Sequence, residues 1–336
     1  MKRIIAAAVL SLGLVVGSTA MAADWNFYGS ARVSMFWTDA DNGDAGDPDV
    51  EFSEALQGNS RIGAKVKVSD ELTGRFEYGA KNGAANIRHL YGEWNFGAGK
   101  LLVGQTDSLL KYSLGNQVYD DDAAMNKWGA VDCSRRPMVR LTFGGFQVAA
   151  IQPYEGTGFD RAVMPKFELK YTLSMDNFSL DAAGGYQTYK TAADIDVDAY
   201  LLAVGAKFNF GPAYVHAGGW YGQNPGAYGM ANTVSDDPTF TADDTNDNDG
   251  YGVMGALGFK INDMFALEGG VGYVNCELDG ASDEDEAMAY YVQATITLAS
   301  GVSIVPEIGY LDNMDSMSGE DQGDAVYYGM KWQINF

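Results

Sequence analysis

The chain has 336 residues, and its 45 Asp and Glu against 22 Lys and Arg give a formal net charge of −23 at pH 7. This balance argues against a nucleic-acid binder, which needs a basic face for the phosphates. A hydrophobic content of 46% excludes a disordered acidic tail. Two cysteines and two histidines exclude a disulfide scaffold and a four-thiolate zinc site. The 42 glycines, 12% aromatic residues and only 8 prolines favour strands and turns.

The first 22 residues have the pattern of a secretory signal peptide. Lys2 and Arg3 form a basic n-region, residues 4–16 form an apolar run, and Ala20-Met21-Ala22 matches the A-x-A cleavage pattern. The run is shorter than the ~20 residues that a membrane-spanning helix needs. We therefore expect cleavage after Ala22 and export of one domain, residues 23–336.

The rest of the chain alternates between apolar and polar residues. In the last segment, every second residue from Tyr328 to Phe336 is apolar or aromatic, and the residues between are Gly, Lys, Gln and Asn. Such a period of two places the two sets on opposite faces of a strand. The pattern predicts sixteen strands, at residues 25–35, 61–68, 74–80, 91–96, 101–105, 139–143, 146–152, 166–173, 178–189, 199–210, 213–221, 251–261, 265–274, 288–298, 302–311 and 328–336.

The connections between these strands alternate between short and long. Short turns on one rim and long loops on the other, with an even number of strands, are typical of an outer-membrane barrel. A soluble β-sandwich, the alternative, has no reason to show this alternation. The predicted fold is therefore all-β, a 16-stranded antiparallel transmembrane β-barrel with short periplasmic turns and long extracellular loops.

The charged residues of the predicted strands fall on one parity, which we assign to the barrel interior. A Lys or Arg that faces lipid at mid-bilayer costs about 2–4 kcal/mol, and a one-residue slip would turn every side chain around. The register is therefore strongly specified. The inward charged residues are Arg32, Arg61, Lys65, Lys67, Arg75, Arg140, Lys166, Lys170, Lys207, Lys260, Lys331, Glu77, Glu93, Glu168, Asp181, Glu268 and Glu307. Aromatic residues cluster near both ends of the strands, at the two expected membrane interfaces.

Four features carry a family resemblance: the sixteen-strand plan, Ser60-Arg61-Ile62-Gly63 followed by Ser69-Asp70-Glu71-Leu72, Val103-Gly104 before a long third loop, and the terminal Phe336. With these features the chain resembles the general diffusion porins of Gram-negative outer membranes. The resemblance implies a homotrimer in the outer membrane that passes ions and small hydrophilic solutes passively, without catalysis or cofactor. It also implies that the third loop folds into the pore. Phe336 looks like the assembly signal that the barrel-assembly machinery reads.

The third loop, about residues 106–135, is the longest in the chain. Because porin constrictions set basic wall residues against acids of this loop, we expect its charges to line the pore. The expected wall residues are Arg32, Arg61, Arg140 and Gln105, and the expected loop residues are Asp107, Asp120, Asp121 and Asp122. Gln105 stands where the family pattern has an arginine, which should weaken the transverse field. The alternative for residues 120–122 is a solvated run of loop acids.

The other long loops are also strongly acidic. We expect them to form an outer vestibule that attracts cations. The alternative is that they provide solubility and loosely bind Ca²⁺ or Mg²⁺ that bridges to lipopolysaccharide phosphates. No resident metal or cofactor is expected, since residues 243–250 lack the acidic first and last ligands of a calcium loop. Cys133 and Cys276 both lie near the outer rim in an exported protein, so a disulfide between them stays open.

Two other functions remain as alternatives. Tyr28, Tyr91, Tyr214 and Trp220 have inward parity and could line a binding track in a substrate-selective channel. A structural or adhesive surface barrel, plugged by its third loop, is the second alternative. An enzyme is not expected, because His89 and His216 are far apart and no catalytic set accompanies them.

Overall fold

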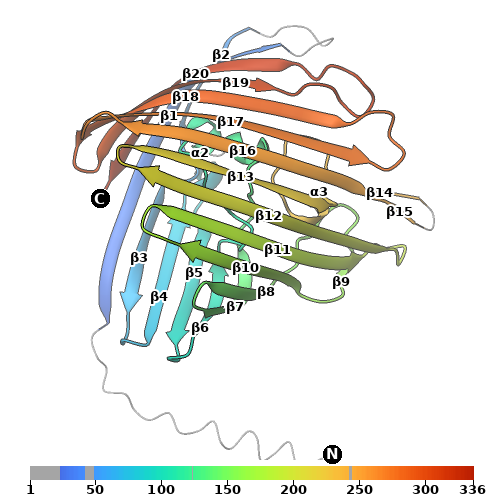
Figure 1. Ribbon diagram of the computed structural model, residues 1–336, viewed down its shortest axis with the longest axis horizontal. Helices are drawn as coiled ribbons and strands as arrows, with labels where there is room; N and C mark the ends of the chain where they lie inside the picture. Colours follow the sequence, from blue (N-terminus) through green and yellow to red (C-terminus); the bar gives the residue numbers. More distant parts are fainter. Residues whose placement is uncertain (1–22, 42–48, 123, 242–243) are drawn as a thin grey trace, which may run out of the picture.

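The computed structural model describes residues 23–41, 49–122, 124–241 and 244–336, which form a closed antiparallel barrel (Figure 1). The predicted signal peptide, residues 1–22, lies outside the described residues. The sixteen wall strands are β1 (Asp24–Asp41), β3 (Arg61–Lys67), β4 (Leu72–Gly79), β5 (Asn86–Asn95), β6 (Lys100–Thr106), β7 (Arg136–Phe143), β8 (Phe146–Ile151), β10 (Lys166–Ser174), β11 (Phe178–Lys190), β12 (Asp196–Phe210), β13 (Ala213–Gln223), β16 (Asn248–Lys260), β17 (Phe265–Leu278), β18 (Asp285–Ala299), β19 (Val302–Asp312) and β20 (Asp324–Asn335).

The predicted strands are all confirmed, with ends that differ by a few residues. Pairing of β1 with β20, from Ser30↔Asn335 to Asp41↔Asp324, closes the barrel, so that the wall satisfies its own backbone hydrogen bonds. Short additional elements lie in the long loops: β2 (Glu51–Leu56), β9 (Arg161–Ala162), β14 (Thr239–Phe240), β15 (Thr245–Asn246), η2 (Lys81–Gly83), α2 (Tyr119–Asp122), η3 (Ala124–Lys127) and α3 (Pro225–Tyr228). Within the described ranges, no helix has the length and apolarity needed to cross a membrane.

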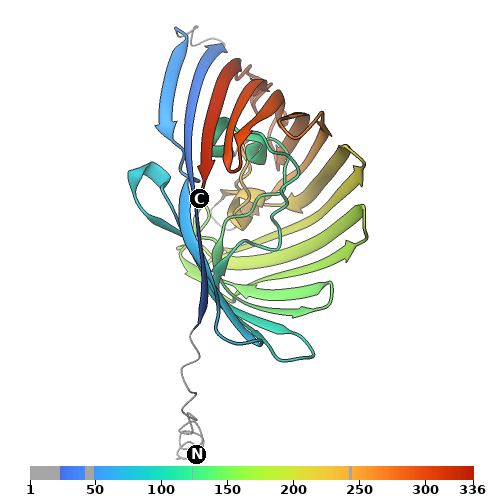
Figure 2. The same cartoon turned by 90° about the vertical axis from the view of Figure 1, so that its left-hand side faces the viewer.

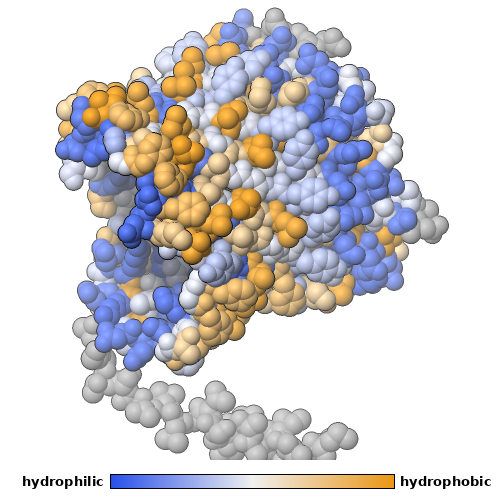
Figure 3. Space-filling model, in the orientation of Figure 1, coloured by the Kyte–Doolittle hydropathy of each residue, from blue (hydrophilic) through white to orange (hydrophobic). Residues whose placement is uncertain are grey.

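The predicted register is confirmed by exposure. Outward residues such as Ile62 (58%), Leu202 (58%) and Val292 (60%) are exposed, whereas the inward Glu268 and Lys331 are buried. In Figure 3, hydrophobic residues lie across the middle of the visible wall among residues of intermediate hydropathy, and hydrophilic residues gather at the loop end on the right. The exposed aromatic residues also form the two predicted belts, with Trp25, Phe27 and Trp94 at the turn end and Tyr221, Tyr251 and Tyr290 at the loop end.

The chain ends at the barrel seam. Phe336 exchanges backbone hydrogen bonds with Gly29 of β1, at 2.6 and 3.0 Å. Its ring lies on the outer face, 71% exposed, and a Cβ on Gly29 would meet it at 2.5 Å. Phe336 is thus placed where an assembly factor could reach it, and its role as assembly signal stays a prediction.

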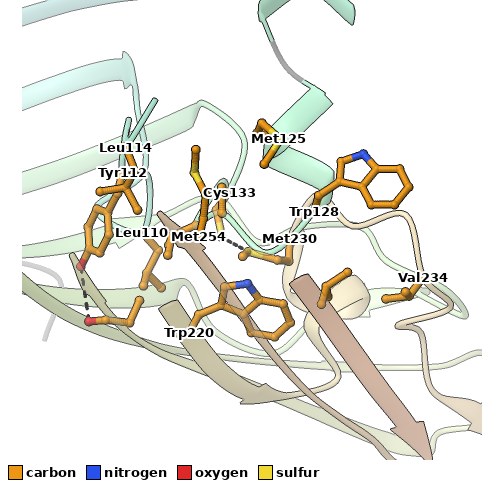
Figure 4. Close-up of a cluster of buried hydrophobic side chains, with 14 of the residues drawn as sticks. Leu110, Tyr112, Leu114, Met125, Trp128, Cys133, Trp220, Met230, Val234 and Met254 are labelled. Carbon is orange, nitrogen blue, oxygen red and sulfur yellow. Dashed lines mark hydrogen bonds between the residues drawn. The ribbon is translucent and has the colours of Figure 1, made fainter. Parts of the chain in front are cut away.

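The segment between β6 and β7, residues 107–135 and here called L3, lies inside the barrel (Figure 2). Its apolar side chains pack on the inner face of the longer strands, from β11 to β20. There they form the main buried cluster, part of which is drawn in Figure 4. Leu110, Tyr112 and Trp128 come from L3, and Trp220 and Met254 come from β13 and β16. The predicted inward folding of this loop is therefore confirmed.

Candidate functional site: the pore lining and L3

Glycines of the inner wall let L3 lie directly against the strands. A Cβ on Gly272 of β17 would meet the carbonyl oxygen of Trp128 at 1.9 Å, and one on Gly205 of β12 would meet the Tyr112 ring at 2.8 Å. Both positions face inward, where a larger side chain would push the loop into the lumen. Part of the high glycine content therefore makes room for L3.

Two buried carboxylates, on β17 and β19, bind the backbone of the middle of L3. Glu268 of β17 accepts hydrogen bonds from the backbone N–H and the side-chain amide of Asn116, both at 2.6 Å. Glu307 of β19 accepts from the N–H groups of Val118 and Tyr119, at 2.8 and 3.0 Å. Bonds from backbone N–H to a carboxylate are stronger than neutral ones. The sequence places both acids inside the barrel but does not show that they anchor the loop.

A third carboxylate holds the start of L3. Glu168 of β10 accepts hydrogen bonds from Ser108 Oγ at 2.8 Å and from the Leu109 N–H at 2.7 Å. Lys166 lies 3.5 Å from the same carboxylate, and Tyr228 donates to it at 3.0 Å. The side chains of Ser108, Lys166, Glu168 and Tyr228 are all buried. Their ion pair and hydrogen bonds compensate the loss of hydration.

The tip of L3 crosses the lumen to the β1 side. Asp122 forms ion pairs with Arg32 at 2.5 Å and with Lys331 at 3.0 Å. Asp121 accepts a hydrogen bond from the Gly58 N–H at 2.9 Å. The expected opposition between wall cations and loop acids is thus realised by Arg32 and Asp122. Residues 121 and 122 are not a freely solvated run.

The remaining predicted loop acids pair within L3 instead. Asp120 forms an ion pair with Lys127 at 2.7 Å, and Asp107 forms one with Arg135 at 2.8 Å. Asp107 also lies 3.9 Å from His89 of the wall. These two acids are therefore largely neutralised by their own loop.

Three arginines surround one buried carboxylate on the inner face of β3, β4 and β5, and we call this group the Glu77 cluster. Glu77 accepts from Arg75 and Arg88, each at 2.7 Å, and lies 3.7 Å from Arg61. Tyr28 donates to it at 2.8 Å. The arginine side chains stay 12–24% exposed while Glu77 is fully buried. The cluster therefore presents a net positive surface to the lumen.

Arg88 is a pore residue that the sequence pattern misses. The pairing of β4 with β5 shifts between Glu77↔His89 and Tyr78↔Ile87, which leaves Arg88 as the extra residue of a β-bulge. The bulge turns both Arg88 and His89 inward, whereas strict alternation would send one of them to lipid. Nothing in the local sequence marks the bulge except this improbable outward charge.

The prediction for Gln105 is wrong. On β6 the buried inward residues are Leu102 and Thr106, and Gln105 lies on the other face opposite Pro137 and Leu90. Its side-chain amide donates to the carbonyl oxygen of Ile87 at 2.8 Å, across the bulged strand. An amide at this outer position does not take part in the transverse field.

Arg140 faces the lumen, and among the described residues its ion-pair partner is an acid of the wall and not of L3. Its guanidinium lies 4.0 Å from Glu93 of the neighbouring wall, whose other oxygen is 3.1 Å from Lys100. Arg140 therefore adds positive charge nearer the turn end of the wall, below the L3 tip.

The four inward aromatic residues do not form a continuous track. Trp220 is buried beneath L3, and Tyr214 donates to the L3-anchoring Glu268. Tyr28 belongs to the Glu77 cluster, and Tyr91 packs beside the apolar root of L3. These rings support the loop and the cluster, so the binding track expected for a substrate-selective channel is not seen.

Cys133 and Cys276 are both free and buried. The Sγ of Cys133 lies 3.7 Å from the Met230 sulfur (Figure 4), and burial raises the pKa of its thiol. The Sγ of Cys276 lies against Gly250, where an added Cβ would be 2.6 Å away. The disulfide that the sequence leaves open is therefore not formed.

Comparison with known proteins agrees with this architecture. A family model described as Gram-negative porin matches residues 6–316. Among curated proteins, no sequence matches. The outer-membrane channel DcaP of Acinetobacter baumannii superposes with a TM-score of 0.79 at 20% identity, covering 95% of this chain and 99% of that one.

Two further structures have the same fold. The trimer form of OmpT from Vibrio cholerae has a TM-score of 0.61 at 15% identity, covering 94% of this chain and 100% of that one. An anion-selective porin from Comamonas acidovorans has a TM-score of 0.61 at 14% identity, with coverage of 93% and 100%.

Proposed function

We propose, on the premise that this chain belongs to the Gram-negative porin family, that its passive channel favours small anions at the constriction and gathers cations at its outer mouth. The channel lies in the outer membrane and passes solutes by diffusion. The observation that carries the selectivity proposal is the Glu77 cluster, in which one carboxylate faces three arginines. No catalytic step is proposed for it.

The balance of charge around the L3 tip supports an anion preference. Asp122 is shared between Arg32 and Lys331, so this pairing leaves one positive charge in excess. Arg61, Arg75 and Arg88 leave two more beside Glu77. Charges at a narrow, low-dielectric passage act on a permeating ion more strongly than charges in open water. Guanidinium groups also match the geometry of carboxylate and phosphate groups.

The outer mouth carries the opposite charge. The exposed acids of its loops include Glu155, Asp160, Asp194, Asp244, Glu277, Asp279, Asp283, Glu284, Asp315, Glu320 and Asp321. They outnumber the nearby bases and contribute to the net charge of −23. We propose that they raise the local cation concentration when the salt concentration is low, and that they loosely hold Ca²⁺ or Mg²⁺ against lipopolysaccharide.

Reversal potentials across planar bilayers test both parts. At 1 M KCl the Debye length is about 3 Å, so the exposed loop acids are screened and the constriction should give a preference for chloride. At 0.01 M the Debye length is about 30 Å, and the permeability ratio should shift toward potassium. A cation preference at 1 M contradicts the basic constriction, and an unchanged ratio at 0.01 M contradicts the acidic vestibule.

The family and the fold support a proposal about the partners. A homotrimer is supported by the trimeric form of OmpT, which shares the fold. We further propose that the signal peptide is removed after Ala22, that Phe336 serves the barrel-assembly machinery, and that the outer wall contacts lipid and lipopolysaccharide. A blocked channel, as in a purely structural or adhesive barrel, would show no conductance for the purified protein and would contradict the proposal.

A further inference from the structure

The tip of L3 has an unusual backbone. Asp120, Asp121 and Asp122 all have positive φ angles, of 49°, 63° and 61°. A single aspartate adopts this left-handed region readily. A left-handed turn of several L-residues is unfavourable, because each Cβ then lies too close to the following carbonyl oxygen. Backbone of this kind persists only where the surrounding contacts hold it, so the shape of the tip depends on what it touches.

A short wall segment between β2 and β3, residues 57–60, holds this tip, and we call it the tip receptor. The side-chain amide of Asn59 donates to the carbonyl oxygen of Asp121 at 2.6 Å and to the carboxylate of Asp122 at 2.7 Å. The N–H of Gly58 donates to the Asp121 carboxylate, and a Cβ on Gly58 would meet that carboxylate at 2.7 Å. The tip receptor therefore binds two of the three left-handed residues.

The part of the tip that this receptor holds is short, since the residue before it is fixed separately. The ring of Tyr119 stacks on Tyr327 of β20, with centroids 3.9 Å apart, and meets the edge of Phe36 of β1 at 5.1 Å. Its backbone N–H is bound by Glu307. Loss of the receptor contacts therefore frees residues 120–122 and leaves the rest of L3 in place.

The carboxylate of Asp122 lies in a set of donors that is built like an anion-binding site. Arg32 and Lys331 both contact it, and their side chains are only 12% and 8% exposed. The Nε of Arg32 donates to Ser30 Oγ at 3.0 Å, which orients the guanidinium. With the amide of Asn59, two charged donors and one neutral donor converge on a single carboxylate. Donors placed in this way suit any small anion that offers two oxygens on one charged group.

We propose that Arg32, Lys331 and Asn59 form an oxyanion-binding site of the pore, and that Asp122 occupies it as a displaceable internal ligand. This inference rests on the anion-selective channel proposed above and states which anions its constriction binds. When a free oxyanion replaces Asp122, residues 120–122 leave their left-handed turn and the tip moves off its receptor. This relaxation offsets part of the advantage that a tethered ligand has over a free one.

Hydrogen exchange of the purified channel tests this site, with acetate as the probe. Acetate replaces chloride stepwise at constant ionic strength, and exchange is measured at residues 57–60 and 120–122. Because acetate binds only the released form, exchange there should rise with its concentration, by about tenfold at about nine times the dissociation constant. Exchange at residues 107–112, the start of L3, should stay the same. Exchange at the receptor that does not depend on acetate would overturn the proposal.

A matched pair of glycine variants tests the role of the left-handed turn. Asp120→Gly relieves the turn and keeps the receptor contacts of the next two residues, so about fivefold more acetate should be needed for the same exchange. Asp194→Gly is the control, since Asp194 also has a positive φ, of 67°, and an ion pair with a nearby base, and lies between β11 and β12. It should keep the wild-type acetate response. An equal shift in both variants would contradict the strained tip.

Direct binding gives a readout that does not depend on exchange. In Asp122→Asn the competing side chain has lost its charge, so saturation-transfer NMR should show acetate bound about tenfold more tightly. Asp107→Asn, which changes an L3 acid paired with Arg135, should keep the wild-type affinity.

The outcomes separate this site from the channel proposal. Equal acetate affinity in Asp122→Asn and wild type, with chloride preference kept at 1 M KCl, would overturn the internal ligand and leave the anion-selective channel intact. A cation preference at 1 M KCl with acetate-dependent exchange at the receptor would instead overturn the proposed selectivity and support the site.

Discussion

Glu307 on β19 accepts a 2.8 Å hydrogen bond from the backbone N–H of Val118, at a sequence separation of 189 residues. This bond belongs to a set in which carboxylates of β10, β17 and β19 each hold a successive part of L3. Each carboxylate accepts at least one of these bonds from a backbone N–H group, and that bond does not depend on the identity of the loop's side chain. The position of L3, and with it the width left for solutes, is set by acids of the wall.

Removal of this charge should loosen L3. In Glu307→Gln, the Val118 and Tyr119 N–H groups keep only a neutral acceptor, and a hydrogen bond to a charged group contributes about 1.5–3 kcal/mol. Hydrogen exchange of residues 114–122 should therefore accelerate by about thirtyfold, which corresponds to about 2 kcal/mol. Glu93→Gln, a wall carboxylate that does not touch L3, is the control. Unchanged exchange in Glu307→Gln would show that the anchor contributes nothing.

The close approach of L3 to the wall predicts a strong effect of small substitutions. In Gly272→Ala, the new Cβ would lie 1.9 Å from the Trp128 carbonyl oxygen, so L3 must move away from β17. We expect a lower thermal unfolding midpoint and an altered single-channel conductance. Gly269→Ala changes an outward glycine of the same strand, where the nearest atom is 3.3 Å away. If both variants change the unfolding midpoint and the conductance equally, the change arises from the strand itself and not from the contact between L3 and β17.

The β-bulge in β5 predicts which of two polar residues sets selectivity. Arg88→Ala removes a lumen charge 2.7 Å from Glu77, so the chloride preference at 1 M KCl should fall. Gln105→Arg adds a charge on the outer face, so it should leave the permeability ratio unchanged. It should also reduce the yield of inserted barrel, because an arginine facing lipid is unfavourable by up to about 2–4 kcal/mol. An increased chloride preference in Gln105→Arg would contradict the outward position of Gln105 and show that this residue lines the pore.

The loop between β13 and β16 should be pH-dependent. Asp236 accepts a hydrogen bond from Asn232 at 2.7 Å beside Asp237, and burial raises its pKa to about 7. Since the folded loop favours the protonated form, this stabilisation is fully present below about pH 4 and is lost as the pH rises through 7. Protection factors of residues 224–237 should therefore be higher at pH 5 than at pH 8.

Two variants check the origin of this dependence. Asp236→Asn should remove most of the difference between pH 5 and pH 8, whereas Asp244→Asn, an exposed acid of the same loop, should keep it. A difference that survives in Asp236→Asn would assign the pH dependence to another group.

The periodic features of the barrel could be predicted from the sequence alone. Alternation from Tyr328 to Phe336 and in the other strands gave the strand number, the register and the lipid-facing surface, because the contrast between water and hydrocarbon acts on each residue separately. The same reasoning placed Arg32, Arg61 and Arg140 inside the barrel. The resemblance to porins, and not the alternation, implied that L3 carries an acid to a wall arginine, as Asp122 does with Arg32.

Only the tertiary structure decided the remaining features. The bulge at Arg88 and the outward position of Gln105 depend on how β5 pairs with β4 and β6. This pairing cannot be inferred from the sequence of one strand. The position of L3 inside the barrel depends on glycines and carboxylates from strands far apart in the chain. Local alternation determines which face of a strand meets lipid, whereas hydrogen bonds and close packing between distant segments determine where the loop crosses the pore.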